Sequence, residues 1–124
     1  MSDREPVVCA TFHHAVELIG RRWTGAVIQV LLRGRARYCT IRGAIPGVND
    51  RMLSERLREL ELEGIVERTV IPETPVRVEY HLTRKGRALQ KTLDALSEWA
   101  DKWKPDAAPA ARPAKAAAGG RGDR

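Results

Sequence analysis

The chain has 124 residues, of which 43% are hydrophobic and 31% charged, and a net charge of +6 at neutral pH; these values suit a globular protein of one domain. No apolar run approaches the roughly 20 residues that a membrane-spanning helix needs, and the first residues, MSDREPVVC, lack the pattern of a signal peptide. Because two cysteines are too few for a secreted disulfide scaffold, we expect a cytoplasmic protein with reduced thiols.

Apolar residues at helical spacing predict four helices in the first half of the chain. They lie at about residues 12–19, 23–33, 41–45 and 50–63. Helix-breaking residues separate them, namely Gly20, Gly34, the pair Pro46-Gly47, and Gly64. Asn49 suits the N-cap of the fourth helix, and the polar residues 35–38 are expected to form a connection before the third.

The second half changes to strand periodicity. Residues 65–71 are rich in β-branched side chains, residues 76–82 alternate apolar with polar side chains, and the loop 72–75 between them contains two prolines. Thr83 is expected to cap a last, long helix. Its apolar residues, at gaps of 4, 3, 4 and 3, form a heptad seam: Leu89, Leu93, Leu96, Ala100 and Trp103.

This order of elements predicts a mainly α protein with a β-hairpin wing, that is, a winged helix-turn-helix of the α+β class. We expect a flexible N-terminus over residues 1–8 and one folded domain over 9–103. Residues 104–124 are rich in Ala, Pro, Gly and Arg, which predicts a disordered tail.

The fourth helix has two opposite faces. Its apolar face, which should pack on the preceding helices, carries Leu53, Leu57 and Leu60. Its polar face carries Arg51, Ser54, Glu55 and Arg58. Arginine can pair with guanine, glutamate can accept from cytosine, and serine can do either, so this face can read DNA bases. Leu62 falls near the polar face, and we expect the hairpin to cover it.

Positive charge is concentrated around this helix. Residues 21–58 hold nine arginines and two acids, a local balance of nine minus two, or +7, which suits a polyanion such as DNA. We add to the candidate DNA interface Asn49, at the helix start where a phosphate can bind, and Arg42 of the third helix. In the hairpin, Arg77 and Arg68 reach phosphates or a minor groove, or else they pair with Glu67 or Glu79. The alternative for the whole set is a solvated charged surface.

Four sequence segments, which follow one another along the chain between Cys9 and Trp103, resemble those of a known family. They are LIGRRWTGAVI, MLSERLRELELEGIVER, PETPVRVEYHLTRKG and LSEWADKW. With them the chain resembles the HxlR-type winged-helix transcription regulators, and within that family the YodB-like repressors that sense oxidants and electrophiles. The resemblance implies a repressor that binds a palindromic DNA operator as a homodimer through its first and last helices. The dimer residues expected there are Phe12, Val16, Leu89, Leu93, Leu96 and Trp103. Alternatively, the last helix packs on its own domain.

The resemblance also implies a redox-sensing role for Cys9, which lies fourteen residues before Trp23 as in the YodB-like group. A helix N-terminus and nearby cations favour the reactive thiolate. Two features depart from the group: Ala10 stands where proline is usual, and Lys104 stands where a cysteine follows the last helix. Cys39 is a possible replacement for that second thiol. The alternative is that Cys9 is an unreactive thiol packed against an apolar surface. The regulator would then be controlled by a small ligand or by a partner protein.

Other classes of function have less support in the sequence. A metal site from Cys9, His13, His14 and Cys39 would lack the usual ligand spacing, so we expect no metal. The absence of a nucleophile elbow and of a Gly-rich phosphate loop argues against an enzyme or a cofactor. A winged helix that binds a partner protein remains an alternative. A salt titration would distinguish it from a DNA-binding protein, whose affinity for DNA falls steeply as salt rises.

Overall fold

The computed structural model describes residues 8–104. The expected flexible N-terminus (residues 1–8) and the expected disordered tail (residues 104–124) therefore fall almost entirely outside the described residues. The chain divides between Gln90 and Lys91 into two compact units.

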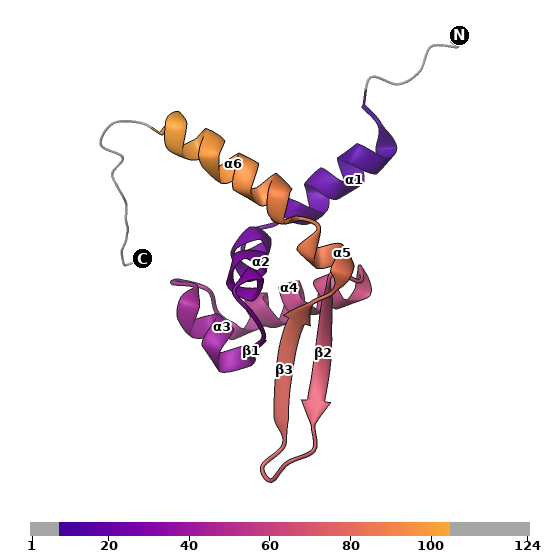
Figure 1. Ribbon diagram of the computed structural model, residues 1–124, viewed down its shortest axis with the longest axis vertical. Helices are drawn as coiled ribbons and strands as arrows, with labels where there is room; N and C mark the ends of the chain where they lie inside the picture. The colour runs from indigo at the N-terminus through magenta and orange to yellow at the C-terminus, as the bar shows by residue number, and fades with distance from the viewer. Residues whose placement is uncertain (1–7, 105–124) are drawn as a thin grey trace. The chain divides into compact units, whose positions relative to one another are not determined.

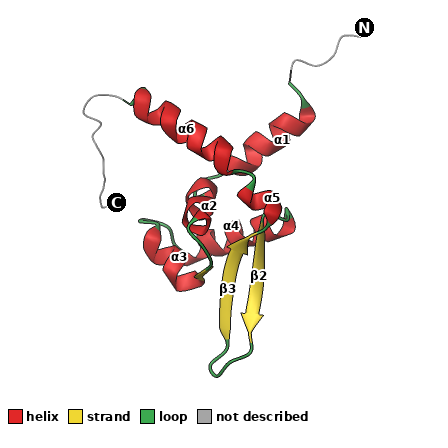
Figure 2. Ribbon diagram, viewed as in Figure 1, coloured by secondary structure: helices red, strands yellow, loops and turns green. Residues whose placement is uncertain are grey.

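The first unit contains helices α1 (Ala10–Ile19), α2 (Thr24–Leu32), α3 (Tyr38–Ala44), α4 (Asp50–Leu62) and α5 (Arg84–Arg87), and strands β1 (Ala36–Arg37), β2 (Val66–Ile71) and β3 (Arg77–Leu82) (Figures 1 and 2). Helix α6 (Gln90–Lys102) provides nearly all of the described second unit. Helices α2, α3 and α4 followed by the β2–β3 hairpin make a winged helix-turn-helix, which confirms the predicted fold class.

The core of the first unit lies where α2, α3 and α4 meet. The aliphatic side chains of these three helices that are at most 2% exposed are Val27, Ile28, Ile41, Leu53, Leu57 and Leu60. The three leucines are those of the predicted apolar face of α4. Because burying one such side chain contributes about 1.5–3 kcal/mol, this face fixes the position of α4 in the unit.

Both ends of α4 are those the sequence predicts. The Asn49 side chain accepts a hydrogen bond from the backbone N–H of Met52 at 2.8 Å, as an N-cap does. Gly64 follows the helix with φ +76°, a conformation that a residue with a side chain rarely adopts. The polar face of α4 therefore begins and ends at defined points.

The wing is a three-stranded antiparallel sheet in the order β1-β3-β2. Strand β2 pairs with β3 from Val66↔Leu82 to Ile71↔Arg77, and β1 adds the pair Ala36↔Tyr80. The expectation that residues 35–38 form only a polar connection is wrong, since two of them form β1. A strand of two residues shows no periodicity that would predict it.

The predicted single helix after Thr83 is also wrong. Thr83 does act as an N-cap, accepting from the N–H of Gly86 at 3.1 Å, but α5 ends at Arg87 and a turn that includes Leu89 precedes α6. This turn follows a segment tied to the start of β2, where Thr83 N–H donates to the Ile65 carbonyl at 3.0 Å. Gly86 packs so closely that a Cβ would overlap with the same carbonyl oxygen. Leu89 therefore lies outside the helix that carries the rest of the seam.

Leu62 is not covered by the hairpin as expected, because 81% of it is exposed. Ile65 and Val66 are buried, so the chain after α4 turns toward the buried face of that helix. Strand β2 thus contacts α4 but leaves Leu62 uncovered.

Candidate nucleic-acid interface and thiol site

The outer face of α4 carries the four predicted base-reading residues, and all four are exposed. Arg51 and Glu55, one turn apart, form an ion pair with 3.4 Å between Nε and Oε2. Arg58, two turns after Arg51, forms no ion pair with any residue in the described range. The face therefore contains one paired and one unpaired arginine, together with the Ser54 hydroxyl.

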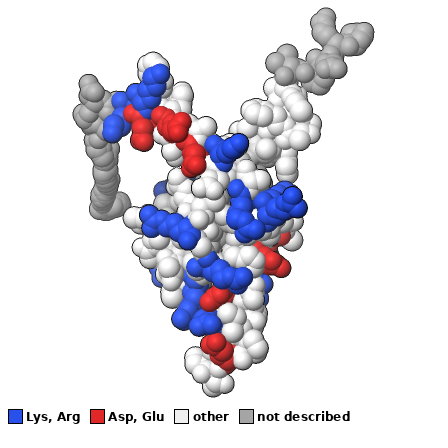
Figure 3. Space-filling view, viewed as in Figure 1, with Lys and Arg blue, Asp and Glu red and all other residues white. Residues whose placement is uncertain are grey.

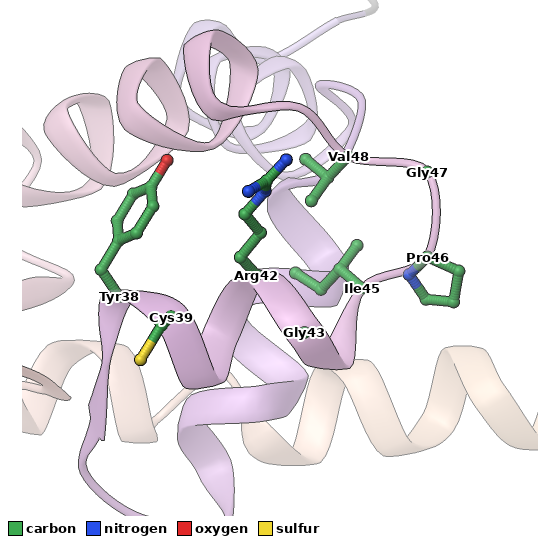
Figure 4. Close-up of a pocket in the computed structure, with 8 residues that line it drawn as sticks. All are labelled: Tyr38, Cys39, Arg42, Gly43, Ile45, Pro46, Gly47 and Val48. Carbon is green, nitrogen blue, oxygen red and sulfur yellow. The ribbon is translucent and has the colours of Figure 1, made fainter.

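A cluster of polar side chains joins α3 to the start of α4. Arg42 Nε lies 3.3 Å from Asp50 Oδ1. The Tyr38 hydroxyl is 2.9 Å from the same carboxylate oxygen, 3.1 Å from the Asp50 carbonyl oxygen and 3.4 Å from Ser54 Oγ. Tyr38 and Arg42 point to the same side of α3, as expected for residues one turn apart (Figure 4).

The Tyr38 hydroxyl acts as a donor in this cluster. Partial burial, with the Asp50 carboxylate as a further cause, raises the pKa of Tyr38 above its ordinary value. A tyrosine phenol is protonated at neutral pH even with its ordinary pKa of about 10, so the hydroxyl can donate to Asp50. Neither Tyr38 nor Asp50 was predicted from the sequence as a site residue, although an acid directly after the N-cap of a reading helix is a signal that could have marked Asp50.

Beside this cluster, α3 and the following turn border an open hollow of about 460 Å³ (Figure 4). Residues 38–39, 42–43 and 45–48 line it. The Cys39 sulfur points away from the side chains of Tyr38 and Arg42. Cys39 is an exposed free thiol and the second residue of α3, which begins earlier than the expected third helix at about residues 41–45.

A buried arginine on the inner side of α4 connects this helix to the loop after α1. Arg56 Nε donates to the Arg22 carbonyl oxygen at 2.9 Å, and its Nη1 donates to Glu59 Oε2 at 2.8 Å. The same oxygen lies 3.8 Å from Arg21 Nη1. Arg56 was not predicted from the sequence as a site residue, although it occurs at helical spacing from Leu53 and Leu60 and so falls on the apolar face.

In the wing, Arg77 is held by two glutamates. Its Nη2 lies 3.1 Å from Glu73 Oε2 and its Nε lies 3.3 Å from Glu79 Oε2. Glu67 pairs instead with His81, at 3.0 Å. Of the two wing arginines, Arg68 is exposed and forms no ion pair within residues 8–104. The contact with Glu79 was one of the alternatives left open by the sequence.

Basic side chains gather over the first unit in several patches, with acidic side chains between them (Figure 3). This alternation fits the ion pairs described above, in which Arg42, Arg51 and Arg77 each contact a neighbouring carboxylate. The surface of this unit is therefore one of partly compensated positive charge.

Cys9 is the residue directly before α1 and is an exposed free thiol. The backbone N–H groups of Phe12 and Thr11 lower the pKa of Cys9, and the Thr11 side chain adds to this effect. These groups stabilise the thiolate as a helix N-terminus does. His13, one turn onward, pairs with Glu17 at 3.4 Å.

The residues expected at a dimer contact differ in exposure. Phe12 and Val16 on α1 are exposed, and so are Leu96 and Trp103 on α6. Leu93, by contrast, is buried, and Leu89 is half-buried in the turn before α6. The sequence pattern omitted Trp99, which is exposed and lies at helical spacing from Leu96 and Trp103.

Residues 8–104 contain neither a group of metal ligands nor a membrane-spanning helix. No three His, Cys, Asp or Glu side chains of this range lie where they could hold a metal ion. Nor does the range contain a helix long and apolar enough to cross a membrane.

Residues 18–108 match the model of a family described as HxlR-like helix-turn-helix. The chain is 50% identical to YvaP of Bacillus subtilis, an uncharacterized HTH-type transcriptional regulator, over 96 residues, which are 77% of this chain and 89% of YvaP. It is 47% identical to the HTH-type transcriptional regulator YodB of the same organism, also over 96 residues, 77% of this chain and 86% of YodB.

Solved structures of YodB and of related regulators have the same fold. Reduced YodB has a TM-score of 0.74 at 44% identity and covers 82% of this chain with all 100% of its own. Quinone-bound YodB has a TM-score of 0.69 at 42% identity, covering 77% of this chain and 100% of its own. The redox regulator HypR in its oxidized form has a TM-score of 0.72 at 33% identity, covering 77% and 99%. The chain therefore belongs to the HxlR-like helix-turn-helix family and is a transcriptional regulator.

Proposed function

We propose that this regulator is a homodimeric repressor that reads a palindromic DNA operator with α4 and is switched by oxidation or alkylation of Cys9. The observation that carries the DNA-reading part is the two-sided structure of α4. Three leucines buried in the core fix one side, and the opposite side exposes a row of groups that can bond to base edges.

Different side chains of the interface have different roles. Arg51, Ser54, Glu55 and Arg58 read bases from the major groove, because they share the exposed face of one helix. Arg42 and Asn49 contact the phosphate backbone beside the start of α4. Since the Asn49 oxygen caps the helix, the side-chain amide N–H is the group left to bind a phosphate. Arg77 serves as a wing contact, for which it must leave Glu73 and Glu79.

Two exposed apolar stripes support the homodimer. Helix α1 exposes Phe12 and Val16, and α6 exposes Leu96, Trp99 and Trp103. Exposed apolar side chains gathered along a helix mark an interaction surface. A second copy of the chain can cover them, and twofold symmetry would then present two α4 helices to the two halves of a palindrome.

Cys9 has the properties of a sensing thiol. It is exposed, and its lowered pKa increases the thiolate fraction at neutral pH. The thiolate attacks a quinone ring carbon, a C–S bond forms, and the ring takes up the electron pair and a proton to become a hydroquinone thioether. With diamide, thiolate sulfur adds to the N=N bond, and a second thiol then displaces the hydrazine to form a disulfide.

Relatives in this family support such chemistry. YodB has been solved in a quinone-bound form and also after diamide treatment, the latter with a TM-score of 0.69 at 46% identity, covering 81% of this chain and 100% of its own. In the present chain, the second thiol of a disulfide is Cys39 or the Cys9 of the partner copy. Modification beside α1 would alter the dimer contact and so the spacing of the two reading helices.

DNA reading is tested with fluorescently labelled duplexes from the region upstream of the gene and with scrambled versions of them. We expect tighter binding of the upstream duplex, weakening steeply as salt rises. Arg58→Gln should lower this preference, since a lost base contact costs about 1–3 kcal/mol. Lys91→Gln makes the same charge change outside the winged-helix unit and serves as the matched control. Equal binding of all duplexes by the parent protein would contradict sequence reading.

The thiol switch is tested by adding diamide or a quinone to the protein–operator complex. We expect the parent protein and the Cys39→Ser variant to lose operator affinity with quinone, and the Cys9→Ser variant to keep it. Loss of affinity in Cys9→Ser to the same extent as in the parent would refute the role of Cys9. Intact-mass measurement of the treated parent and of both variants shows which cysteine the adduct requires.

A further inference from the structure

An acidic residue stands at the start of the proposed reading helix, where a negative charge opposes the approach of DNA. Asp50 is the first residue of α4. Its carboxylate Oδ1 lies 3.3 Å from Arg42 Nε and 2.9 Å from the Tyr38 hydroxyl. One oxygen atom thus contacts both a cation and a hydroxyl donor from α3.

Tyr38 fixes the orientation of this carboxylate. The tyrosine is half-buried, and its hydroxyl also lies 3.1 Å from the Asp50 backbone oxygen. An exposed ion pair gains little in water because ordering two mobile side chains costs entropy. A carboxylate already held by a half-buried tyrosine loses less freedom on pairing, so Arg42 gains a defined partner.

The contrast with Arg58 shows what this pairing does to the surface. Arg42 lies on α3 and contacts the start of α4, Arg58 lies on α4 itself, and both are exposed. Arg58 has no ion-pair partner in residues 8–104, so its full charge acts on any DNA that approaches. Arg42 must leave Asp50 to bind a phosphate, and the phosphate then meets the Asp50 carboxylate. The net attraction of Arg42 for DNA of arbitrary sequence is therefore small.

We propose that Asp50 is a specificity-determining residue, which withholds Arg42 from random-sequence DNA and so lowers non-specific affinity. This inference rests on the proposed DNA-reading function. At the operator, base contacts from α4 hold the helix against the duplex and compensate for the separation of Arg42 from Asp50. Random DNA offers no such contacts, so the ratio of specific to non-specific affinity rises.

The test is a double-mutant cycle on a random-sequence duplex. Asp50→Asn removes the charge and keeps an oxygen that can accept from Tyr38. We expect it to raise random-duplex affinity about fivefold at low salt and to steepen the slope of log K against log salt by about 0.9, the value for one added phosphate contact. In an Arg42→Gln background, the same substitution should change the affinity less than about twofold, because no arginine is released.

Two further variants and one control sharpen the cycle. Tyr38→Phe keeps both charges but frees the carboxylate, so random-duplex affinity should rise less than in Asp50→Asn. Asp50→Ser repeats the charge removal with a residue that is also accepted at a helix start. Asp94→Asn, the same charge change on α6, should leave random-duplex affinity unchanged. Thermal unfolding of every variant verifies that it is folded.

Each outcome separates the inference from the function on which it rests. An unchanged random-duplex affinity in both Asp50→Asn and Asp50→Ser overturns the inference alone. The same is true if Asp50→Asn raises the affinity equally with and without Arg42, because the effect is then a general loss of negative charge. A parent protein that binds no duplex at all overturns the proposed function, and this inference with it.

Discussion

Helices α1 and α4 are both amphipathic, but only α4 buries its apolar face. Leu53, Leu57 and Leu60 of α4 are at most 2% exposed, whereas α1 has no buried residue, and Phe12 is 65% exposed. The same periodicity in the sequence thus has two different outcomes. An apolar stripe that its own chain leaves uncovered indicates a surface for a second molecule.

The polar groups of α1 and α4 differ as well. The groups at the start and outer face of α4 contact one another or α3, as in the pairs Arg51–Glu55 and Arg42–Asp50. At the start of α1, the Cys9 thiol is exposed, with a pKa lowered by backbone N–H groups. Helix α4 is therefore suited to present a fixed surface to DNA, and the start of α1 is suited to carry a reactive thiol. A hydrogen bond of the buried Arg56 joins α4 to the loop after α1.

The largest expected effect is on the free energy of unfolding, and it distinguishes the apolar face of α4 from that of α1. Leu57→Ala should lower the free energy of unfolding by about 3 kcal/mol, because it removes buried methyl groups and leaves a cavity. Phe12→Ala should change it by less than about 0.5 kcal/mol in dilute protein, where no partner covers α1. Urea denaturation followed by circular dichroism measures both. Similar losses in the two variants would show that the stripe of α1 is buried within its own chain.

The next effect concerns the connection between the helices. Arg56→Met should cost about 2 kcal/mol of unfolding free energy, since it leaves the Arg22 carbonyl and one Glu59 oxygen without their donors. Arg58→Met, two positions further along and exposed, should change the free energy by less than about 0.5 kcal/mol. The same denaturation measurement compares them. If both variants are equally stable, Arg56 does not hold the loop to α4.

A smaller effect is expected on self-association. Phe12→Ala should weaken the dimer about tenfold, which corresponds to about 1.4 kcal/mol, because the side chain presents its apolar surface to the second copy. Sedimentation equilibrium gives the dissociation constants. The matched control is Thr92→Ala on α6, a residue outside the apolar stripe. An unchanged constant in Phe12→Ala would place the dimer contact elsewhere.

The smallest expected effect is in the thiol chemistry of α1. Because the pKa of Cys9 is lowered, more of it is thiolate at neutral pH, and iodoacetamide should react faster than with an unstructured cysteine peptide. The midpoint of the rate–pH profile should lie at lower pH than that of the peptide. A Cys39→Ser background ensures that only Cys9 is measured. A midpoint equal to or above the peptide's would contradict stabilisation by the N–H groups of α1.

Much of the first unit could be predicted from local patterns. The two faces of α4, its Asn49 cap and the hairpin all depend on residues close together in the sequence, where periodicity and capping preferences act directly. Strand β1 could not be predicted, because its pairing with β3 joins Ala36 to Tyr80, far along the chain. The break between α5 and α6 depends likewise on the contact of Gly86 with Ile65.

The candidate site shows the same limit. Exposure of Arg51, Ser54, Glu55 and Arg58 follows from the helical period, but their partners do not. Tyr38 contacts Asp50 across the helix-turn-helix, and Arg56 contacts a carbonyl before α2. Both contacts require the packing of α4 on the neighbouring helices, which a pattern along one helix does not specify.

The most direct test is to select preferred binding sites from a library of random duplexes with the parent protein and to sequence them. If α4 reads bases and the uncovered apolar stripes pair two copies, the selected sites will contain an inverted repeat with half-sites about one helical turn, 10–10.5 base pairs, or a multiple of it apart. Enrichment of a single half-site without its inverted copy, or no enrichment over the starting library, would contradict the account.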